Sequence, residues 1–159
     1  MNTSPRDDAL RYLEGHNVAT LATTGPEGPW AAAVFYANTG FTLYFLSSPT
    51  SRHGSNIGDG ADVAATIQED YSDWREIKGI QLEGRAKRLE GAERAEAEAR
   101  FGAKFPRLVS PALAPTAIAR ALRLVAWYEL EPTRVCFVDN SRGFGHRDEI
   151  PVSDVSSTV

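Results

Sequence analysis

The longest strand pattern in the chain, at residues 77–89, constrains the fold more than any other segment. Apolar or small residues alternate there with polar residues, which is the period of two that a pleated strand imposes. The apolar face consists of Ile80, Leu82, Gly84 and Ala86. The polar face consists of Gln81, Glu83, Arg85 and Lys87. One face is therefore expected to be buried and the other to meet water, as is typical of antiparallel sheets.

Shorter strand patterns lie before and after this segment. They are at residues 18–23, 30–37, 41–46, 63–67, 122–130 and 133–138. The turn sequence TGPEG at residues 24–28 joins the first two into an antiparallel hairpin. About seven strands, three or four short helices and no regular alternation of strand and helix predict a mainly β (α+β) protein, an antiparallel β-barrel with short peripheral helices.

Helices are predicted at four places. Residues 4–15 begin with serine, proline and acidic residues and end at a glycine. Residues 49–57 begin near a proline, and residues 91–105 have an apolar side made of Ala97, Phe101 and Phe105. Residues 110–117 contain two prolines and are predicted to form an irregular connection, followed by a short helix to residue 121.

The chain has 159 residues, the size of one domain. We expect this domain to span residues 1–147, with a flexible C-terminal tail at residues 148–159. Lysine and arginine total 17 against 21 aspartate and glutamate, for a net charge of −4, and no basic block interrupts this balance. This balance argues against a surface for duplex nucleic acid. No apolar run has the length of a membrane span, and the first ten residues lack an apolar signal segment, so we expect a cytoplasmic protein without a membrane partner.

The strand at residues 41–46 leads directly into a segment rich in hydroxyls and cations. Its hydroxyl groups belong to Ser47, Ser48, Thr50 and Ser51. Pro49 can open a helix there, and Arg52 and His53 follow in its first turns. Free backbone N–H groups at a helix start and a guanidinium together make a phosphate site. A helix cap at Ser47 or Ser48 with a surface charge at Arg52 explains the same pattern, and both interpretations stay open.

The strand at residues 30–37 contains three consecutive alanines, from Ala31 to Ala33. Alanine is a poor strand former and fills little volume. Such a strand allows a flat or bulky group to lie against its backbone, but a tightly packed barrel corner gives the same pattern.

The side chains that usually carry catalysis are absent from the sequence as recognisable motifs. His16, His53 and His146 lack the spacing of a metal site, and neither a nucleophile elbow nor a Walker loop is present. A candidate phosphate site beside a strand of alanines, without a catalytic set, suggests that a bound cofactor carries any chemistry.

Five blocks occur in an order that resembles a known superfamily. They are VATLAT, AAAVFYA, LYFLSSPTSRH, KGIQLEGRAKRLEG and WYELEPTRVCFVDN. This order resembles the split-barrel flavin-binding proteins of the pyridoxamine 5′-phosphate oxidase-like superfamily, over about residues 8 to 147. The blocks at residues 51–53, 78–84 and 137–145 are similar to those of one small bacterial branch.

The resemblance implies a split β-barrel that binds flavin over residues 1–147 and forms a homodimer with FMN at the subunit interface. It implies that Ser47, Ser51 and Arg52 bind the 5′-phosphate, with His53 where many relatives have lysine. The strand next to the isoalloxazine ring would contribute Ala32, Ala33 and Val34, and Gln81 would hydrogen-bond the edge of the ring. Leu46 and Ser48 complete the predicted cofactor-binding set. Trp127 and Phe144 are expected near the cofactor, although Trp127 fits an ordinary core position equally well.

The function implied is that of an FMN-dependent oxidoreductase acting on an unidentified small molecule. The alternative is a binding or storage protein for a flavin, deazaflavin or haem without turnover, and a third interpretation is a structural dimer with an empty groove. In the oxidases this strand opens with an arginine and closes with a lysine. Residues 30–35 lack both cations, which lowers the expected FMN affinity. His146 and Arg147 match the substrate signature only loosely, so a pyridoxal-type substrate is not expected.

Overall fold

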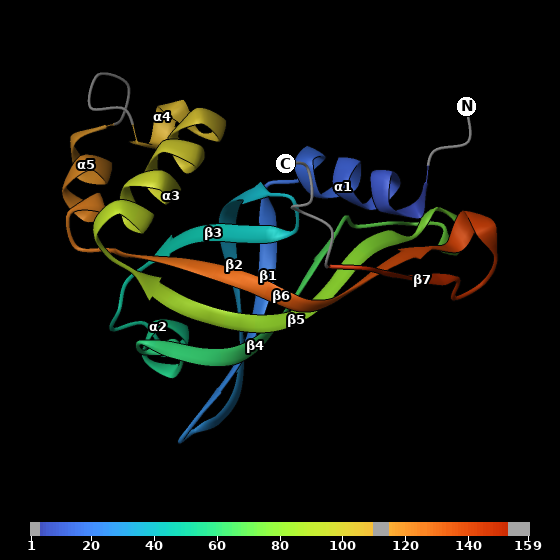
Figure 1. Cartoon of the computed structure of the whole chain (residues 1–159), viewed down its shortest axis with the longest axis horizontal. Coiled ribbons are helices and arrows are strands. Elements are labelled where there is room, and N and C mark those ends of the chain that lie inside the picture. Colours follow the sequence, from blue (N-terminus) through green and yellow to red (C-terminus); the bar gives the residue numbers. More distant parts are fainter. Residues whose placement is uncertain (1–3, 110–114, 153–159) are drawn as a thin grey trace, which may run out of the picture.

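One antiparallel sheet closes on itself in the computed structural model, which describes residues 4–109 and 115–152 (Figure 1). The strands are β1 Val18–Gly25, β2 Gly28–Thr39, β3 Thr42–Ser47, β4 Gly60–Gln68, β5 Lys78–Leu89, β6 Ala126–Asp139 and β7 Arg147–Ile150. Their order is β3-β2-β1-β4-β5-β6-β7, and β3 also pairs with β6. The first six strands therefore form a closed barrel and β7 extends β6. The predicted mainly β antiparallel barrel with short peripheral helices is confirmed.

Short helices surround this barrel. They are α1 Pro5–Gly15, α2 Arg52–Ile57, α3 Gly91–Lys104, α4 Pro106–Val109 and α5 Thr116–Leu122, with single 3₁₀ turns η1 Trp74–Glu76 and η2 Asn140–Arg142. Figure 1 shows α3, α4 and α5 gathered at one end of the barrel and α2 beside β4. Among the described residues, no helix combines the length and the apolarity that crossing a bilayer requires.

The barrel interior is filled by the apolar faces of the strands, as the period of two predicts. Its fully buried side chains include Leu21, Tyr36, Phe45, Ile80 and Tyr128. A second core joins α3 to β2, β5 and β6. It consists of Ala37, Leu89, Ala97, Phe101 and Trp127. The predicted apolar side of α3 is thus confirmed, and it packs on the barrel.

One bent strand, β6, replaces the two strands predicted at residues 122–130 and 133–138. The predicted strand at residues 122–125 is wrong, because Leu122 ends α5 and residues 123–125 connect this helix to β6. The register between β5 and β6 shifts at Gly84, which pairs with Pro132. A Cβ atom at Gly84 would lie 2.1 Å from the carbonyl oxygen of Glu131, so only glycine allows this approach. The bend replaces the predicted break, because the missing side chain lets the ladder continue past the proline.

The helix predicted to begin near Pro49 begins instead at Arg52, and Ser51 is its cap. The Ser51 hydroxyl accepts a hydrogen bond from the backbone N–H of Gly54 at 3.1 Å. Neither Ser47 nor Ser48 caps α2, so that interpretation is wrong. The cap lies later in the chain because Ser51 has the extended backbone, φ −65° and ψ 157°, that an N-cap requires.

The expected flexible tail from residue 148 is wrong for residues 148–150, which belong to β7. Ile150 is 2% exposed and pairs with Val135. Arg6 of α1 also donates to the carbonyl oxygen of Pro151, at 2.5 Å. Strand β7 therefore extends the sheet beyond β6, and the buried side chain of Ile150 holds it there. The rest of the predicted tail, residues 153–159, lies outside the described residues.

Candidate functional site

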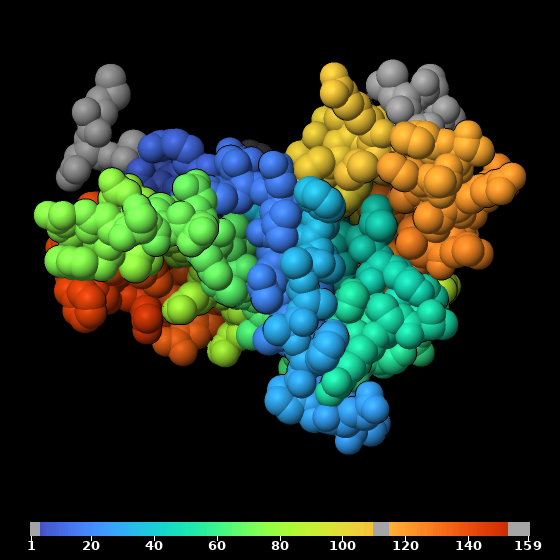
Figure 2. All heavy atoms as spheres, turned by 180° about the vertical axis from the view of Figure 1, so that it is seen from behind, coloured from blue at the N-terminus to red at the C-terminus, as the bar shows by residue number. Residues whose placement is uncertain are grey.

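An apolar crevice of about 330 Å³ separates the barrel from the helices α3 to α5. Its strand side consists of Ala33, Val34, Phe35, Leu46, Ser47 and His53. Its helix side consists of Phe101, Leu108, Ile118, Ala121, Leu122 and Val125. Figure 2 shows this part of the molecule, with α3–α5 in yellow and orange beside the blue strands and above α2 in teal. The volume is at the low end of the range for sites that bind small molecules.

The polar end of the crevice is a cluster of two hydroxyls and one imidazole. Strand β3 ends at Ser47, and the first turn of α2 provides His53, whose Nε2 lies 2.5 Å from the Ser47 Oγ. The Ser51 Oγ lies 3.2 Å from the Ser47 Oγ and 3.4 Å from the same imidazole nitrogen. Burial lowers the pKa of His53, so its ring is neutral near pH 7. We call these three residues the Ser–His cluster.

Arg52 follows the cap of α2 but does not line the crevice. Its guanidinium lies over the ring of Trp30, 4.5 Å from the ring centroid, and its Nη2 donates to the Glu27 carbonyl oxygen at 2.9 Å. These contacts attach α2 to the tip of the β1–β2 hairpin. The Nε of Arg52 is buried and has no hydrogen-bond partner, which no other side chain shows in residues 4–109 and 115–152.

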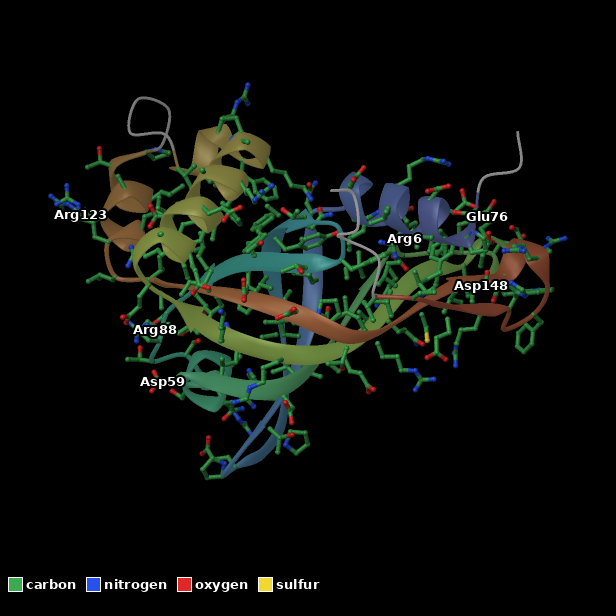
Figure 3. All side chains as sticks on the ribbon, viewed as in Figure 1. Arg6, Asp59, Glu76, Arg88, Arg123 and Asp148 are labelled. Carbon is green, nitrogen blue, oxygen red and sulfur yellow. The ribbon has the colours of Figure 1, made fainter. Side chains whose placement is uncertain are left out.

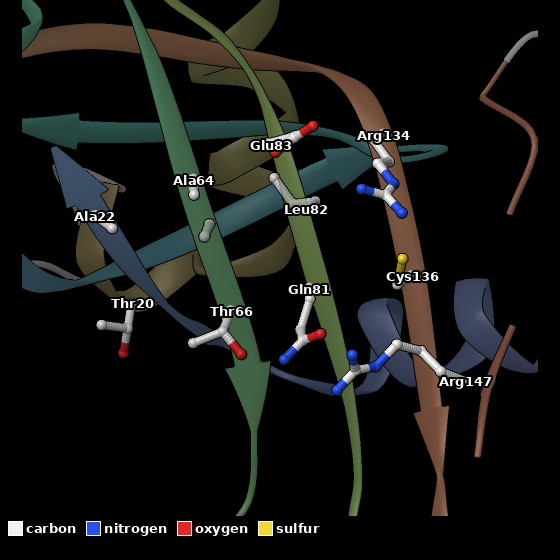
Figure 4. A pocket seen from close by; sticks show the side chains of 11 residues that line it. Thr20, Ala22, Ala64, Thr66, Gln81, Leu82, Glu83, Arg134, Cys136 and Arg147 are labelled. Atoms are coloured by element: carbon white, nitrogen blue, oxygen red, sulfur yellow. The ribbon is translucent and has the colours of Figure 1, made fainter. Parts of the chain in front are cut away.

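A second hollow of about 420 Å³ lies on the outer face of the sheet, and we call it the sheet-face hollow. Its small and polar lining includes Thr20, Ala22, Ala64, Thr66, Gln81 and Cys136. Its charged lining consists of Glu83, Arg134 and Arg147. Figure 4 shows the side chains of Gln81 and Arg147 extending toward the same space.

A register row connects the two hollows across four strands. Gln81 of β5 pairs with Thr66 of β4, Thr66 pairs with Thr20 of β1, and Thr20 pairs with Ala33 of β2. Paired residues of an antiparallel sheet point to the same face, so the four side chains form one line on the outside of the barrel. Three strand spacings place Gln81 about 14 Å from Ala33 along the sheet.

The structure brings together part of the predicted cofactor-binding set. Ala33, Val34, Leu46, Ser47 and His53 line the crevice, and Ser51 joins them through the Ser–His cluster. The remaining members, Ala32, Ser48, Arg52 and Gln81, do not line it. Ala32 and Ser48 are adjacent in the chain to lining residues. Ser48 is exposed, and its Oγ lies 2.9 Å from the Oγ1 of Thr50. Gln81 belongs to the sheet-face hollow.

The aromatic and C-terminal residues expected near the cofactor lie elsewhere. Trp127 is 4% exposed and packs edge-on against Phe101, in the ordinary core position that the sequence also allowed. Phe144 is 83% exposed and contacts Trp74, with ring centroids 5.4 Å apart. Both side chains lie outside the crevice. Trp127 belongs to β6 and faces α3, whereas Phe144 follows η2 and extends into solvent.

Sequence reasoning missed the helix side of the crevice. Thr116 and Ala117, predicted to be irregular, begin α5, and residues 110–114 lie outside the described residues. A usable signal was present, since Ile118, Leu122 and Val125 follow at spacings of four and seven, which is one face of a helix. Across residues 4–109 and 115–152 no group of three or more histidine, cysteine or acidic residues is arranged to hold a metal ion.

Comparison with known proteins places this geometry among related barrels. Residues 6–139 match the family described as pyridoxamine 5′-phosphate oxidase. A UPF0306 protein of Klebsiella pneumoniae (strain 342) is 32% identical over 139 residues, which cover 86% of this chain and 86% of that protein. A solved haem-binding protein from Mycobacterium smegmatis aligns with a TM-score of 0.72 and 26% identity, covering 96% of this chain and 60% of that chain. The haem storage protein HutZ from Vibrio cholerae gives a TM-score of 0.67 at 17% identity, covering 85% and 94%, which is a likeness of fold alone.

Proposed function

We propose that this chain, which belongs to the pyridoxamine 5′-phosphate oxidase family, holds the phosphate of FMN at its Ser–His cluster and acts as a flavin-dependent oxidoreductase. The convergence of Ser47, Ser51 and His53 at the polar end of an apolar crevice carries this proposal. A phosphate ester needs several hydrogen-bond donors, and an aromatic ring system suits an apolar wall. When bound, FMN supplies hydride-transfer chemistry.

The donor set fits a phosphate. Each serine hydroxyl has one proton to donate: that of Ser51 is donated to the Ser48 carbonyl oxygen at 2.7 Å and would turn to a bound phosphate, while the Ser47 hydroxyl contacts the Ser51 hydroxyl and the His53 ring. The buried Nε of Arg52, the residue that follows Ser51, has no hydrogen-bond partner, and its ion-pair partner Glu27 Oε2 lies 3.7 Å away. A phosphate monoester is an acceptor with three free oxygens, so it complements donors of this kind.

The residues around the cofactor hold it and keep water away from it, and they do not react themselves. His53 is the one ionisable side chain in the described lining of the crevice. A phosphate dianion beside it favours the imidazolium form, so binding is coupled to the uptake of a proton at this ring. The small side chain of Ala33 lets a ring approach β2, and the row from Ala33 to Gln81 gives a path along which its edge reaches Gln81.

A homodimer through the outer sheet face belongs to the same proposal. Val18 and Phe35 are apolar and 43% and 51% exposed on that face, and alanines and threonines lie between the charged residues. We expect the dimer in sedimentation velocity, and a monomer for Ala64→Arg, which places a cation at the centre of the face. Ala99→Arg on exposed α3 is the matched control. A wild-type monomer that binds FMN with full occupancy would contradict the interface.

The absorption spectrum tests the cofactor directly. We expect the purified protein to show flavin bands as isolated or after adding FMN and removing the excess. Bands of a deazaflavin would change the cofactor and keep the site. A protein that stays colourless after incubation with excess FMN would refute the proposal.

Haem binding without turnover is the second candidate, favoured by the likeness at 26% identity to a haem-binding protein. His53 has the neutral imidazole that haem iron accepts as a ligand, in an apolar crevice. A haemin titration of wild type and His53→Ala tests this. If His53 is the axial ligand, the variant loses the sharp Soret band, whereas an identical Soret band in both proteins removes His53 from this role.

A further inference from the structure

The helix side of the crevice is apolar wherever the structure describes it. It consists of Phe101, Leu108, Ile118, Ala121, Leu122 and Val125. The strand side adds one ionisable group, His53, at the opposite polar end, and burial keeps this ring neutral near pH 7 by lowering its pKa. The described lining therefore presents no formal charge to a ligand.

The charged side chains of the neighbouring helices have other surroundings. Arg120 of α5 and Arg123, the C-cap of this helix, are exposed, and Arg123 extends away from the molecule (Figure 3). Lys104 at the end of α3 donates to the His16 carbonyl oxygen and lies over the Tyr36 ring, 4.4 Å from its centroid. None of these cations lines the crevice.

We propose that the helix side of the crevice binds an uncharged, largely apolar small molecule, and that this molecule is the substrate. A carboxylate or phosphate lying among the six apolar side chains of the helix side, away from the Ser–His cluster, would give up its water without gaining a cation or a hydrogen-bond donor. An apolar molecule gains by leaving water and contacting the six apolar side chains. The preference of the crevice stands on its lining, whereas the role of the molecule as substrate rests on the proposed function.

The position of the crevice explains why its occupant would meet the cofactor. Ala33 and Val34 line the crevice and belong to the strand along which the flavin ring is proposed to lie. Phe101 closes the space from α3. A molecule held there is confined between β2 and the helices, and the volume of about 330 Å³ limits it to a small molecule.

Two fluorescent probes that differ by one charge test the preference. N-phenyl-1-naphthylamine is neutral, and 1-anilinonaphthalene-8-sulfonate is the same skeleton with a sulfonate. Titrated into cofactor-free protein, the neutral probe is expected to bind at one site per chain and at least about tenfold more tightly than the sulfonate. Equal affinities, or no binding of the neutral probe because another part of the protein or a second copy fills the crevice, would overturn the proposal.

Charge insertion locates the site. Leu122→Lys places a cation in the crevice and is expected to weaken the neutral probe and strengthen the sulfonate. Leu124→Lys is the matched control, because Leu124 is 77% exposed and does not line the crevice. Ala121→Lys repeats the test at an exposed lining position, where folding is not at risk, and circular dichroism checks all three variants. Probe affinities that respond equally to Leu122→Lys and Leu124→Lys place the probe elsewhere and refute the assignment.

Repeating the titration with FMN-saturated protein separates the two proposals. If FMN does not bind but the neutral probe does, the crevice preference holds and the cofactor assignment fails. If FMN binds but the neutral probe binds neither the cofactor-free nor the FMN-saturated protein, the cofactor assignment holds and the inference about the substrate fails.

Discussion

The crevice and the sheet-face hollow are similar in size and opposite in character. The crevice is closed by α3 to α5, and its described lining has no formal charge near neutral pH. The sheet-face hollow has no helical cover and contains Glu83, Arg134 and Arg147. Both use small side chains on strands of the same barrel. The difference shows that the helices α3 to α5 turn one part of the barrel surface into an apolar crevice.

This contrast assigns different partners to the two regions. A dry, narrow space with hydroxyls at one end suits a phosphate-bearing aromatic cofactor and an apolar molecule. An open, charged sheet face suits contact with another protein surface, where the charges lie at a wet rim. The register row from Ala33 to Gln81 is the connection between them.

The largest effect is expected when the helical cover loses its anchor. Phe101→Ala removes a ring that is 1% exposed and packs on Trp127 and Phe105, so it should cost about 3–5 kcal/mol of unfolding free energy. Phe144→Ala, the same change at an 83% exposed position, should stay within about 0.5 kcal/mol. Urea denaturation measures both. Equal small losses would mean that α3 is not held by this core.

Removing a cation should distinguish the crevice from the sheet face next. Arg52 follows Ser51 in the chain, and its buried Nε has no hydrogen-bond partner, so we expect this group to donate to the phosphate of bound FMN. Arg52→Ala is therefore expected to weaken FMN binding by about 1.5–3 kcal/mol, the value of a charge-assisted hydrogen bond. Arg134→Ala, in the sheet-face hollow, is the matched control and should leave the affinity nearly unchanged. Calorimetric titration compares them. The assignment of the two hollows is reversed if Arg134→Ala has the larger effect.

A single hydroxyl should have a smaller effect. Ser47→Ala removes a member of the Ser–His cluster and should weaken FMN binding by about 0.5–1.5 kcal/mol. Ser48→Ala deletes an exposed hydroxyl near Thr50 and should have no measurable effect. The same titration measures both affinities, and two identical losses would show that the position of the hydroxyl does not matter.

The smallest expected effect is a pH dependence from His53. Burial lowers the pKa of this ring below its ordinary 6.5, so the folded cofactor-free protein binds fewer protons than the unfolded chain as the pH falls toward and below that value. Its contribution to stability is therefore full above about pH 6.5 and is lost in acid. His53→Gln should flatten this slope in denaturation midpoints measured at a series of pH values. A slope that is the same in both proteins would assign it to other groups.

The strands were predictable from sequence because their signal is local. The alternation around Ile80 and Leu82 in β5 depends only on which face meets the core, and it is found in the structure. The candidate cluster was predictable for the same reason, since Ser47, Ser51 and His53 lie within one strand end and one helical turn.

The helix side of the crevice depended on tertiary structure. Ile118 and Leu122 become lining residues only because α5 packs across from β2, which no local pattern states. The separation of Gln81 from the crevice likewise depends on strand order, because two intervening strands, β1 and β4, lie between β2 and β5. Strand β6 continues through Pro132 only because Gly84 of β5 pairs with this proline, and the pairing of two distant segments is not a local signal.

The most direct test of the central claim is a titration of cofactor-free protein with FMN and with riboflavin, which is the same ring system without the phosphate. If the Ser–His cluster holds the phosphate, FMN binds at least about tenfold more tightly than riboflavin, and Ser47→Ala and Ser51→Ala reduce that ratio while Ser48→Ala keeps it. Equal affinities of wild-type protein for FMN and riboflavin would contradict the claim that this cluster anchors the cofactor.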